Sequence, residues 1–384
     1  MSGFTALRRI FSDTGRSTQM LAEVREGLAD LTEITNRRVA ELADRAAGRA
    51  GASSAPAPPP AENDLMSRAH IFDEMVPYSG TPPSGFDADW MGVLHDGVTR
   101  AFLGIDRNVF GGVAVARKRP VLSDGEPWFE SVNFVEAARD AKDHYVMITL
   151  GACYGAQATG AAAALCALNP MPFKLVALEP DPVNYAWTQQ HFRDNGIDPD
   201  QHWLINAVIG ESNSPIFFPV GAPGSGAQNS FSTNEAAARE NYVRALIDSG
   251  KQDEALRNLL LRNTTGLKKS LLPGEGFDAE ITLLSAVTLA DILGPFPFVD
   301  YLEADIQQSE ILVFPPFMDV LKRKVRRVHI GTHGADVHDS LAKLFRRKGW
   351  HIIFDYPPNS SHSHPLGSFE LNDGVLTVLN PDLM

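Results

Sequence analysis

The sequence predicts an α/β fold, in which a mostly parallel β-sheet carries helices on both of its faces. From Tyr145 onward, short apolar runs of strand length alternate with segments of helical pattern, as is typical of βα units. The first run ends at a glycine, and a second glycine follows four residues later, before a helix rich in small residues. The last two runs follow one another with only a short connection. Since a parallel strand needs a long crossover, the final strand should be antiparallel.

The composition limits the classes of protein and of partner. The chain has 384 residues, of which 44% are hydrophobic, enough for a sizeable core. Its net charge of −13 argues against nucleic-acid binding, because such proteins usually present a basic face. Cys153 and Cys166 are the only cysteines, so we expect neither a disulfide framework nor a thiolate zinc cluster, and a cytoplasmic location fits best. No apolar run is long enough to span a bilayer, although “ALRRIF” near the N-terminus could make a weak surface contact with a membrane.

Residues 1–49 are expected to be helical. Leu21, Val24, Leu28 and Leu31 follow a 3-4-3 spacing, which is typical of a coiled-coil seam. Because a segment of this size is too small to fold alone, the seam needs a partner. We prefer a short coiled coil that joins subunits into a homo-oligomer. The alternative is a helix that packs on its own catalytic domain.

The rest of the chain divides at changes in composition. Residues 50–64 are rich in Ala, Pro, Gly and Ser and are expected to be a flexible linker. Residues 65–144 carry several aromatic side chains and are expected to be a helical and irregular lead-in that caps the site. The catalytic core is then 145–384, with an insert at about 210–297. Long inserts at the carboxyl edge of a sheet are usually lids or recognition elements, and the alternative is a surface elaboration.

The helices and strands of the core are predicted from the apolar pattern and from residues that typically begin or end a helix. The helix after the second strand should begin at Asp181 and Pro182, an N-cap followed by a first-turn proline, and should end at Gly196. The expected strands are 145–151, 173–180, 202–210, 298–306, 325–334, 350–356 and 374–380, and the expected helices between them include 156–168, 181–196 and 335–349.

The turn “GACYGAQ” after the first strand is the first candidate ligand-binding element. Its first glycine would allow a tight turn and its second would let backbone approach a ligand. The helix that follows offers unpaired N–H groups at its N-terminus. Alone, this turn is a weak signal. We assign Thr149, Gly151, Ala152, Tyr154 and Gly155 to cofactor binding.

Residues at the ends of the second and third strands strengthen this assignment. Glu179, followed by Pro180, could accept hydrogen bonds from both ribose hydroxyls of an adenosine ligand. The alternative is a charge that stabilises the N-terminus of the next helix. Asn206 and Ala207 could present a side-chain amide and a backbone N–H to an adenine edge, or they could form an ordinary strand-to-loop transition. We assign all four residues to the cofactor site.

The fourth and fifth strands supply the candidate catalytic residues. Glu303 and Asp305 share a face because strand side chains alternate, and Asp305 should project at the ligand edge. We assign Asp305 to catalysis and to cofactor binding; its alternative is a helix N-cap. His333, just past the fifth strand, is the candidate base, whereas His329 within that strand should be a core histidine. A metal site of Asp305, Glu310 and His333 is conceivable, but the spacing is not diagnostic.

Four segments in this order resemble the FkbM-type methyltransferases, a branch of the S-adenosylmethionine-dependent superfamily: “LGACYG”, “VALEPDP”, “YLEADIQQSE” and “HIGTHG”. “EPWFESVNFVEAA” is similar to the family's approach to the first strand, and the resemblance covers roughly residues 79–379. It implies a Rossmann-like class I methyltransferase sheet of seven strands, the last one antiparallel. It also implies S-adenosyl-L-methionine lying over Gly151 and Gly155 with its ribose on Glu179, and O-methylation, often of sugar or polyketide hydroxyls.

Thr149 departs from the family pattern, which usually has Asp or Glu two residues before the first glycine, near the methionine moiety. A threonine can hydrogen-bond but brings no charge, so weaker cofactor binding or lost activity stays open. A non-catalytic scaffold is therefore one alternative. A nicotinamide-dependent oxidoreductase is another, although the turn lacks the GxGxxG spacing.

For an O-methyltransferase, the acceptor hydroxyl must lose its proton while oxygen, methyl carbon and sulfonium lie in line. We nominate His333 as the base and Asp305 as the group that orients or assists it. A divalent ion that lowers the hydroxyl pKa is the alternative mechanism.

Overall fold

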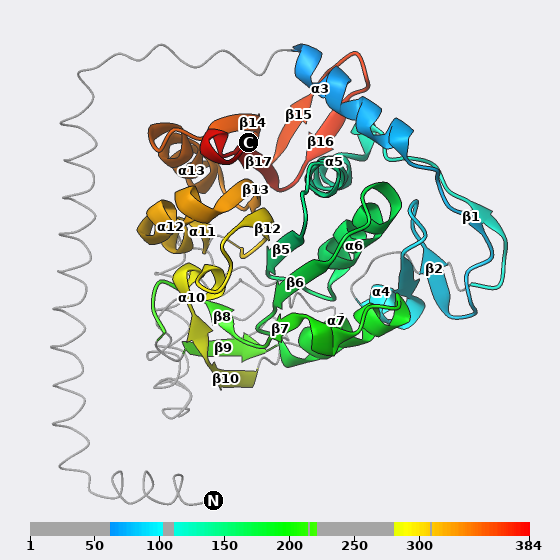
Figure 1. Cartoon of the computed structure of the whole chain (residues 1–384), viewed down its shortest axis with the longest axis horizontal. Coiled ribbons are helices and arrows are strands. Elements are labelled where there is room, and N and C mark those ends of the chain that lie inside the picture. Colours follow the sequence, from blue (N-terminus) through cyan, green and yellow to red (C-terminus); the bar gives the residue numbers. More distant parts are fainter. Residues whose placement is uncertain (1–61, 103–110, 214–215, 221–279, 308) are drawn as a thin grey trace, which may run out of the picture. The chain divides into compact units, whose positions relative to one another are not determined.

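The computed structural model describes residues 62–102, 111–213, 216–220, 280–307 and 309–384 (Figure 1). The expected N-terminal helix and coiled coil, nearly all of the expected linker, and the Gly/Ser-rich loop and polar helix of the insert lie outside these residues. In the described part of the chain, no helix combines the length and the apolar character needed to cross a membrane.

The central element is a seven-stranded sheet with the order β14-β17-β13-β12-β5-β6-β7. All neighbouring strands are parallel except β17, which is antiparallel to both β13 and β14. The predicted Rossmann-like class I methyltransferase sheet with an antiparallel last strand is therefore confirmed. The strands are β5 (Tyr145–Leu150), β6 (Phe173–Leu178), β7 (Trp203–Ile205), β12 (Val299–Ala304), β13 (Val325–Thr332), β14 (His351–Tyr356) and β17 (Gly374–Leu379).

Two predicted connections differ from the structure. The third strand was predicted to continue to Gly210, but it leaves the sheet after Ile205; β8 (Val208–Ile209) pairs instead with β11 (Ala286–Val287). The predicted short connection between the last two strands is also wrong, because it contains an antiparallel pair, β15 (Ser360–His362) and β16 (Phe369–Leu371). Where the insert begins and ends, β9 (Ile216–Val220) pairs with β10 (Glu280–Leu284).

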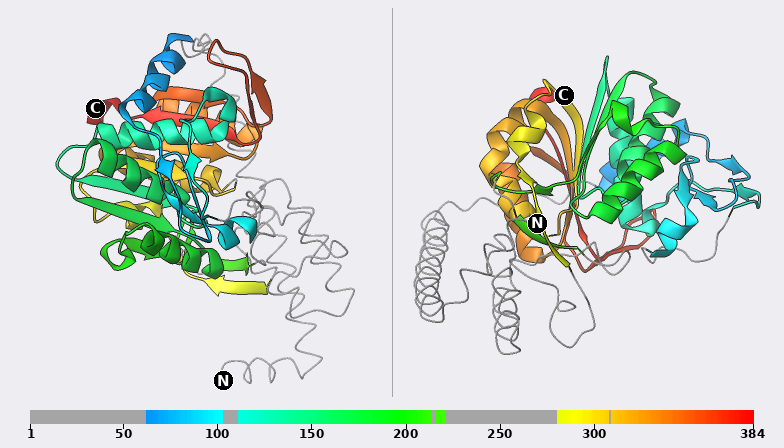
Figure 2. Two further views of the ribbon diagram at one scale, coloured as in Figure 1. Left: turned by 90° about the vertical axis from the view of Figure 1, so that its right-hand side faces the viewer. Right: turned by 90° about the horizontal axis from the view of Figure 1, so that it is seen from below.

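Helices cover both faces of the sheet, as Figure 2 shows with the sheet seen edge-on. Successive residues of β5 point to opposite faces, so Tyr145 and Met147 join one apolar cluster while Val146 and Ile148 join the other. The helices of the first face are α5 (Glu126–Arg139), α6 (Ala156–Leu168) and α7 (Pro182–Asp194), and those of the second are α10 (Leu289–Leu293), α11 (Glu310–Val313), α12 (Met318–Lys324) and α13 (Ala335–Arg347).

Helices α6 and α7 begin as the sequence predicts, for different reasons. The side chain of Asp181 accepts hydrogen bonds from the backbone of Val183 (2.8 Å) and Asn184 (3.1 Å), so it caps α7. Helix α6 begins after Gly155, which has no side chain to cap it. Seven of the first nine residues of α6 are alanine or glycine, and these small side chains let the helix lie close to the sheet.

Helix α5 falls within the expected lead-in, yet it belongs to the sandwich. Its Trp128, Phe129 and Val132 are buried in the first apolar cluster. The face that it turns to the sheet is partly polar: Asn133 lies within hydrogen-bond distance of the ring of His329 (3.1 Å) and the hydroxyl of Thr377 (3.0 Å). His329 is buried with its pKa lowered to about 3 by burial and by the charge of Arg327, and the predicted core role of this histidine is confirmed.

The remainder of the expected lead-in consists of short elements. They are α3 (Glu62–Ala69), β1 (Ser79–Gly80), which pairs with β4 (Val115–Ala116), the hairpin of β2 (Phe86–Ala88) and β3 (Leu94–Asp96), and α4 (Gly97–Phe102). The hairpin is tied to the end of α7, because the Leu94 backbone N–H donates to the Asn195 side chain (2.8 Å) and the Asn195 amide donates back to Leu94 O (2.9 Å).

Candidate active site

The turn between β5 and α6 requires its two glycines. Gly151 has φ +82°, and a Cβ there would lie 2.0 Å from the carbonyl oxygen of Asp305. Gly155 has φ +89°, and a Cβ would lie 2.9 Å from the Thr188 side chain on α7. Left-handed backbone and these approaches both exclude larger residues. The turn is therefore held between the end of β12 and the face of α7.

The N-terminus of α6 opens at the carboxyl edge of the sheet. Gly155 is its N-cap and offers no side-chain oxygen, so the first-turn N–H groups have no side-chain cap. These groups and the helix dipole favour a polar or anionic ligand group at this edge. The arrangement confirms the predicted strand–turn–helix geometry of Gly151 and Gly155.

Glu179 lies at the end of β6 and faces the same turn. Its Oε2 accepts a hydrogen bond from the Cys153 backbone N–H (2.7 Å), and its Oε1 accepts one from the Asp181 N–H (2.9 Å). The side chain is buried, and burial raises its pKa to about 8 although these hydrogen bonds oppose the shift. Carboxylate oxygens accept more than one hydrogen bond each, so ribose hydroxyls could add to the backbone donors.

Asn206 and Ala207 lie where β7 leaves the sheet. The Asn206 amide donates to the carbonyl oxygens of Glu179 and Pro180, both at 2.9 Å. Its donors therefore join the ends of β6 and β7, and only the side-chain oxygen remains for an adenine edge. Ala207 is buried in the second apolar cluster. Pro180 contributes its carbonyl oxygen to this structural contact.

The Tyr154 ring turns toward the hairpin rather than toward Glu179. Its hydroxyl lies 3.4 Å from His95 Nδ1, and its ring packs edge-on against His191 with centroids 5.2 Å apart. The rings of His95 and His191 are stacked. Burial, with the charges of His95 and Arg100, lowers the pKa of His191 to about 3, so that ring is neutral. Tyr154 thus connects the turn to β3, which brings part of the expected cap against the site.

Thr149 and Glu303 are directly opposite one another in the paired strands β5 and β12. The Thr149 hydroxyl donates a hydrogen bond to Glu303 Oε2. Both side chains are buried, and burial raises the pKa of Glu303 well above its usual range, since the nearby Asp305, Glu130 and Glu126 add to the effect. An uncharged residue at 149 therefore contacts a carboxyl group from the neighbouring strand.

Asp305 and His333 come together with three further polar residues. His333 Nε2 lies 3.3 Å from Asp305 Oδ1 and 3.6 Å from Asp373 Oδ1, while its Nδ1 lies 3.6 Å from Glu310 Oε1. The Gln307 amide lies 2.9 Å from Asp305 Oδ1 and 2.7 Å from His333 Nε2. The structure thus unites the two predicted catalytic residues. The alternative role of Asp305 as an N-cap is wrong, because α11 begins at Glu310 with Ser309 before it.

The protonation state of His333 bears on its predicted role. Burial by itself would lower its pKa, but the nearby carboxyl group of Glu310 and the charges of Asp305 and Asp373 raise it to about 9. A pKa of about 9 favours the imidazolium form of His333 at neutral pH, and an imidazolium cannot accept a proton. Partial burial, with the charges of Glu310 and Asp373, raises the pKa of Asp305 above its ordinary value, although its side chain is 44% exposed and the charge of His333 opposes the shift.

Two acids on α5 were not predicted as site residues. Burial, with the charges of Glu130, Asp373 and Asp305, raises the pKa of Glu126 to about 8. Burial also raises the pKa of Glu130 to about 7. Their spacing of four residues places them on one face of the helix, and this periodicity in “EPWFESVNFVEAA” is the signal that could have identified them.

The residues at this edge do not form a recognisable metal centre. Within the described residues, no group of three or more His, Cys, Asp or Glu side chains has an arrangement that could hold a metal ion. The conceivable site of Asp305, Glu310 and His333 is instead a set of charge contacts at 3.3 and 3.6 Å around the imidazole.

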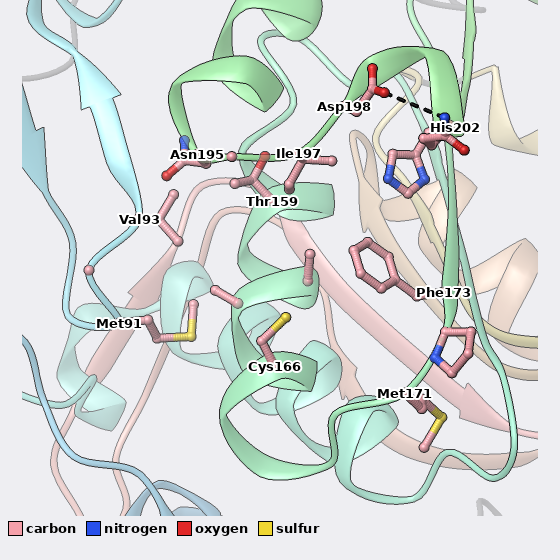
Figure 3. A pocket seen from close by; sticks show the side chains of 16 residues that line it. Met91, Val93, Thr159, Cys166, Met171, Phe173, Asn195, Ile197, Asp198 and His202 are labelled. Carbon is pink, nitrogen blue, oxygen red and sulfur yellow. Dashed lines mark hydrogen bonds between the residues drawn. The ribbon is translucent and has the colours of Figure 1, made fainter.

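A separate cavity of about 660 Å3 lies beside α6 (Figure 3). Residues from α6, from the β2–β3 turn and from the chain after α7 line it, among them Val93, Cys166, Phe173, Ile197 and His202. None of the predicted site residues lines this cavity.

Comparisons with known proteins fit this description. No known protein-family profile matches the chain. A curated protein of Jannaschia sp. (strain CCS1) named “Putative methyltransferase” is 25% identical over 247 residues, which are 64% of this chain and 76% of that protein. Among solved structures, methyltransferase FkbM from Methylobacillus flagellatus KT aligns with 12% identity and a TM-score of 0.34 over 62% of this chain and 44% of its own. The N-terminal domain of human METTL16 aligns with 11% identity and a TM-score of 0.34 over 85% of this chain and 95% of its own.

The name of the curated relative agrees with the resemblance that the four motifs carry. The chain spans less than half of the FkbM structure's own length. The fold assignment rests on the strand order of the sheet and not on these structural overlaps.

Proposed function

We propose that the chain is an S-adenosyl-L-methionine-dependent methyltransferase. The observation that carries the proposal is the position of Glu179: its carboxyl group, at the end of β6, faces the glycine turn and holds the Cys153 N–H of that turn. In doubly wound sheets, an acid at this position binds a ribose and the adjacent helix N-terminus lies at the ligand. When bound, the cofactor would supply an electrophilic methyl group.

The donor set fits such a cofactor. Glu179 offers acceptors for ribose hydroxyls, and the Asn206 side-chain oxygen lies at the end of the neighbouring strand, next to Ala207. Thr149, Gly151, Ala152 and Tyr154 contribute the strand end and the backbone of the turn. The buried acids on the other side of the turn suit a ligand that carries positive charge.

We further propose that the acceptor is a hydroxyl group of a sugar, a glycan or a related natural product. In this mechanism Asp305 takes the hydroxyl proton, and the imidazolium of His333 orients the carboxylate at 3.3 Å and stabilises its charge before the transfer. This reverses the roles first nominated for the two residues, because the raised pKa of His333 keeps it protonated. Positioning of the acceptor in line with the methyl group then supplies much of the rate.

Substitution of Glu179 tests the cofactor assignment. In Glu179→Ala, we expect the dissociation constant of S-adenosylhomocysteine in calorimetry to rise at least about a hundredfold, because two or more hydrogen bonds to a carboxylate are lost. Glu179→Gln keeps the shape of the side chain and serves as the matched control, with a smaller loss. An unchanged affinity in Glu179→Ala would exclude the ribose role.

A methyl-transfer assay tests the reaction class. Radiolabelled methyl donor is incubated with the protein and an extract of cell-surface glycans, with and without a chelator. Labelled glycan in both arms supports metal-independent O-methylation, whereas loss of label with chelator favours the metal-assisted alternative. Binding of the cofactor without label in any acceptor pool would count against this acceptor class.

A non-catalytic scaffold is the second candidate function. The observation that favours it is Thr149, whose hydroxyl contacts Glu303 and brings no charge to the usual position of an acid. Absence of measurable S-adenosylmethionine binding by the wild-type chain would favour this candidate.

A further inference from the structure

The sheet places one acid on each side of the glycine turn. Strand β5, which leads into the turn, lies between β6 and β12. Glu179 follows the last residue of β6, and Glu303 is the penultimate residue of β12. A cofactor with its ribose at Glu179 that crosses the end of β5 therefore extends its amino-acid part toward β12.

Glu303 occupies this second position with a defined partner. It is directly opposite Thr149 in the parallel register, and the Thr149 hydroxyl donates to its Oε2. The hydrogen bond joins residues 154 positions apart in the chain and fixes the carboxyl group beside the strand end at which the turn begins. Thr149 has no acidic group of its own, but its hydroxyl orients the carboxyl group of Glu303.

The Glu303 carboxyl lacks a cation within the protein. It is 4% exposed, and among the described residues no lysine, arginine or histidine forms an ion pair with it. The charged groups that act on it are the acids Asp305, Glu130 and Glu126. A buried carboxylate without a counter-ion is unstable, so this group either holds a proton or pairs with a ligand that brings positive charge.

We propose that Glu303 replaces the missing acid of position 149 and binds the ammonium group of the cofactor's amino-acid part, while Thr149 positions its carboxyl. This inference rests on the proposed function. Burial and the neighbouring acids favour the protonated Glu303 carboxyl in the free protein; when the ligand binds, the proton leaves to solvent and the carboxylate pairs with the ammonium. Binding at neutral pH accordingly releases about one proton from this group.

A comparison of two adenosine ligands tests the proposal. S-Adenosylhomocysteine carries the ammonium group, and 5′-methylthioadenosine lacks the amino-acid part. In Glu303→Gln, we expect the dissociation constant of S-adenosylhomocysteine to rise about ten- to a hundredfold, whereas that of 5′-methylthioadenosine stays within about twofold of wild type. An equal change for both ligands, or no change for either, would overturn the proposal.

Two further variants separate positioning from general charge. Glu126→Gln removes a neighbouring half-buried acid, and it should weaken binding of S-adenosylhomocysteine less than Glu303→Gln does. An equal loss of affinity would indicate the combined field of all the acids and overturn the specific role of Glu303. Thr149→Asp in the Glu303→Gln background returns an acid to position 149 and should restore affinity. Failure of a folded double variant to recover any affinity would also count against the proposal.

Calorimetry on the wild-type protein tests the proposal without any variant, so it still applies if a variant does not fold. The enthalpy of S-adenosylhomocysteine binding is measured at pH 7 in two buffers with different ionisation enthalpies, and their difference gives the protons released. About one more proton released with S-adenosylhomocysteine than with 5′-methylthioadenosine supports the proposal, and equal release refutes it. If the wild-type chain binds neither ligand, the proposed function fails; if it binds both and the variants respond alike, only the role of Glu303 fails.

Discussion

The two ends of α5 meet the sheet through acids in opposite electrostatic situations. Near the carboxyl end of the helix, Glu136 lies 2.6 Å from both Arg68 and Arg327. Near the amino end, Glu126 and Glu130 face other acids. At the carboxyl end of the helix, arginines thus neutralise the charge of the acid. At the amino end, the acids lie beside further acids.

The pKa values express this difference. Asp300, which pairs with Arg326 at 3.1 Å, has its pKa raised by burial to only about 6. Burial and neighbouring acids raise the pKa of Glu126 to about 8 and that of Glu303 well above its usual range. Buried acids with protein cations stabilise the fold, whereas buried acids without them retain protons until a cation arrives. The difference distinguishes carboxyl groups that stabilise the fold from the carboxyl groups that we propose to face the ligand.

Removing the arginine that pairs with Glu136 at the carboxyl end of α5 should have the largest effect on stability. In Arg327→Met, Glu136 and the Asn133 oxygen each lose a buried donor, at 2.6 and 2.9 Å respectively. We expect the free energy of unfolding in urea to fall by about 2–3 kcal/mol, because Asn133 loses a buried donor while Arg68 still pairs with Glu136. The double variant Glu136→Gln/Arg327→Met is the control and should recover part of the loss. A change below about 1 kcal/mol would contradict a structural role for this pair.

Removal of the cation from the ligand end should act on turnover instead. In His333→Gln, Asp305 loses its charged partner, so we expect kcat to fall about a hundredfold or more while S-adenosylhomocysteine binding changes little. His338→Gln, a buried histidine whose ring contacts Asp355 on β14, is the control for loss of a buried imidazole. Retained turnover in folded His333→Gln would remove this histidine from the mechanism.

The uncompensated end should also make stability depend on pH. The pKa values of Glu126 and Glu130 are raised to about 8 and about 7 in the folded chain, so the folded state holds protons that the unfolded chain releases above about pH 4.5. Stability of the ligand-free protein should therefore fall as the pH rises from about 5 to 8. His333, raised to about 9, adds a loss of the same sign as the pH rises through that value.

The pH effect has a matched variant. In Glu126→Gln, Tm should depend less on pH. Between pH 5 and pH 8, the variant should lose about 1–2 kcal/mol less of its unfolding free energy than the wild-type protein loses. Saturating S-adenosylhomocysteine should flatten the wild-type slope as well. A wild-type Tm that rises over this range would show that the acids are paired in solution.

The sheet could be predicted from the sequence because strands and helix ends are marked by residues close to them in the chain. Helix α6 spans the predicted residues, Ala156–Leu168, and Asp181 caps α7 as expected. Glycine, proline and N-cap signals act within a few residues, so they can be interpreted without knowing the fold. The position of Glu179 followed from the end of its strand.

The unpredicted parts of the site depend on contacts between distant residues. Thr149 meets Glu303 over 154 positions, and the Tyr154 ring meets His95 over 59. Neither pairing has a local signal, and the Asn206 donors are taken by carbonyl groups that no pattern reveals. The buried face of α5 was also missed, because acids on a helix normally indicate the solvent side.

The polar face of α5 also has a consequence for synthesis on the ribosome. The helix emerges before the whole sheet, but the partners of Asn133 and Glu136 arrive 191 to 244 residues later, on β13 and β17. Glu136 can pair early with Arg68, which precedes the helix, but its contact with Arg327 and the side-chain contacts of Asn133 to His329 and Thr377 form only after those strands have been translated. The polar contacts between this helix and the sheet are therefore expected to form late, once β13 and β17 have been translated.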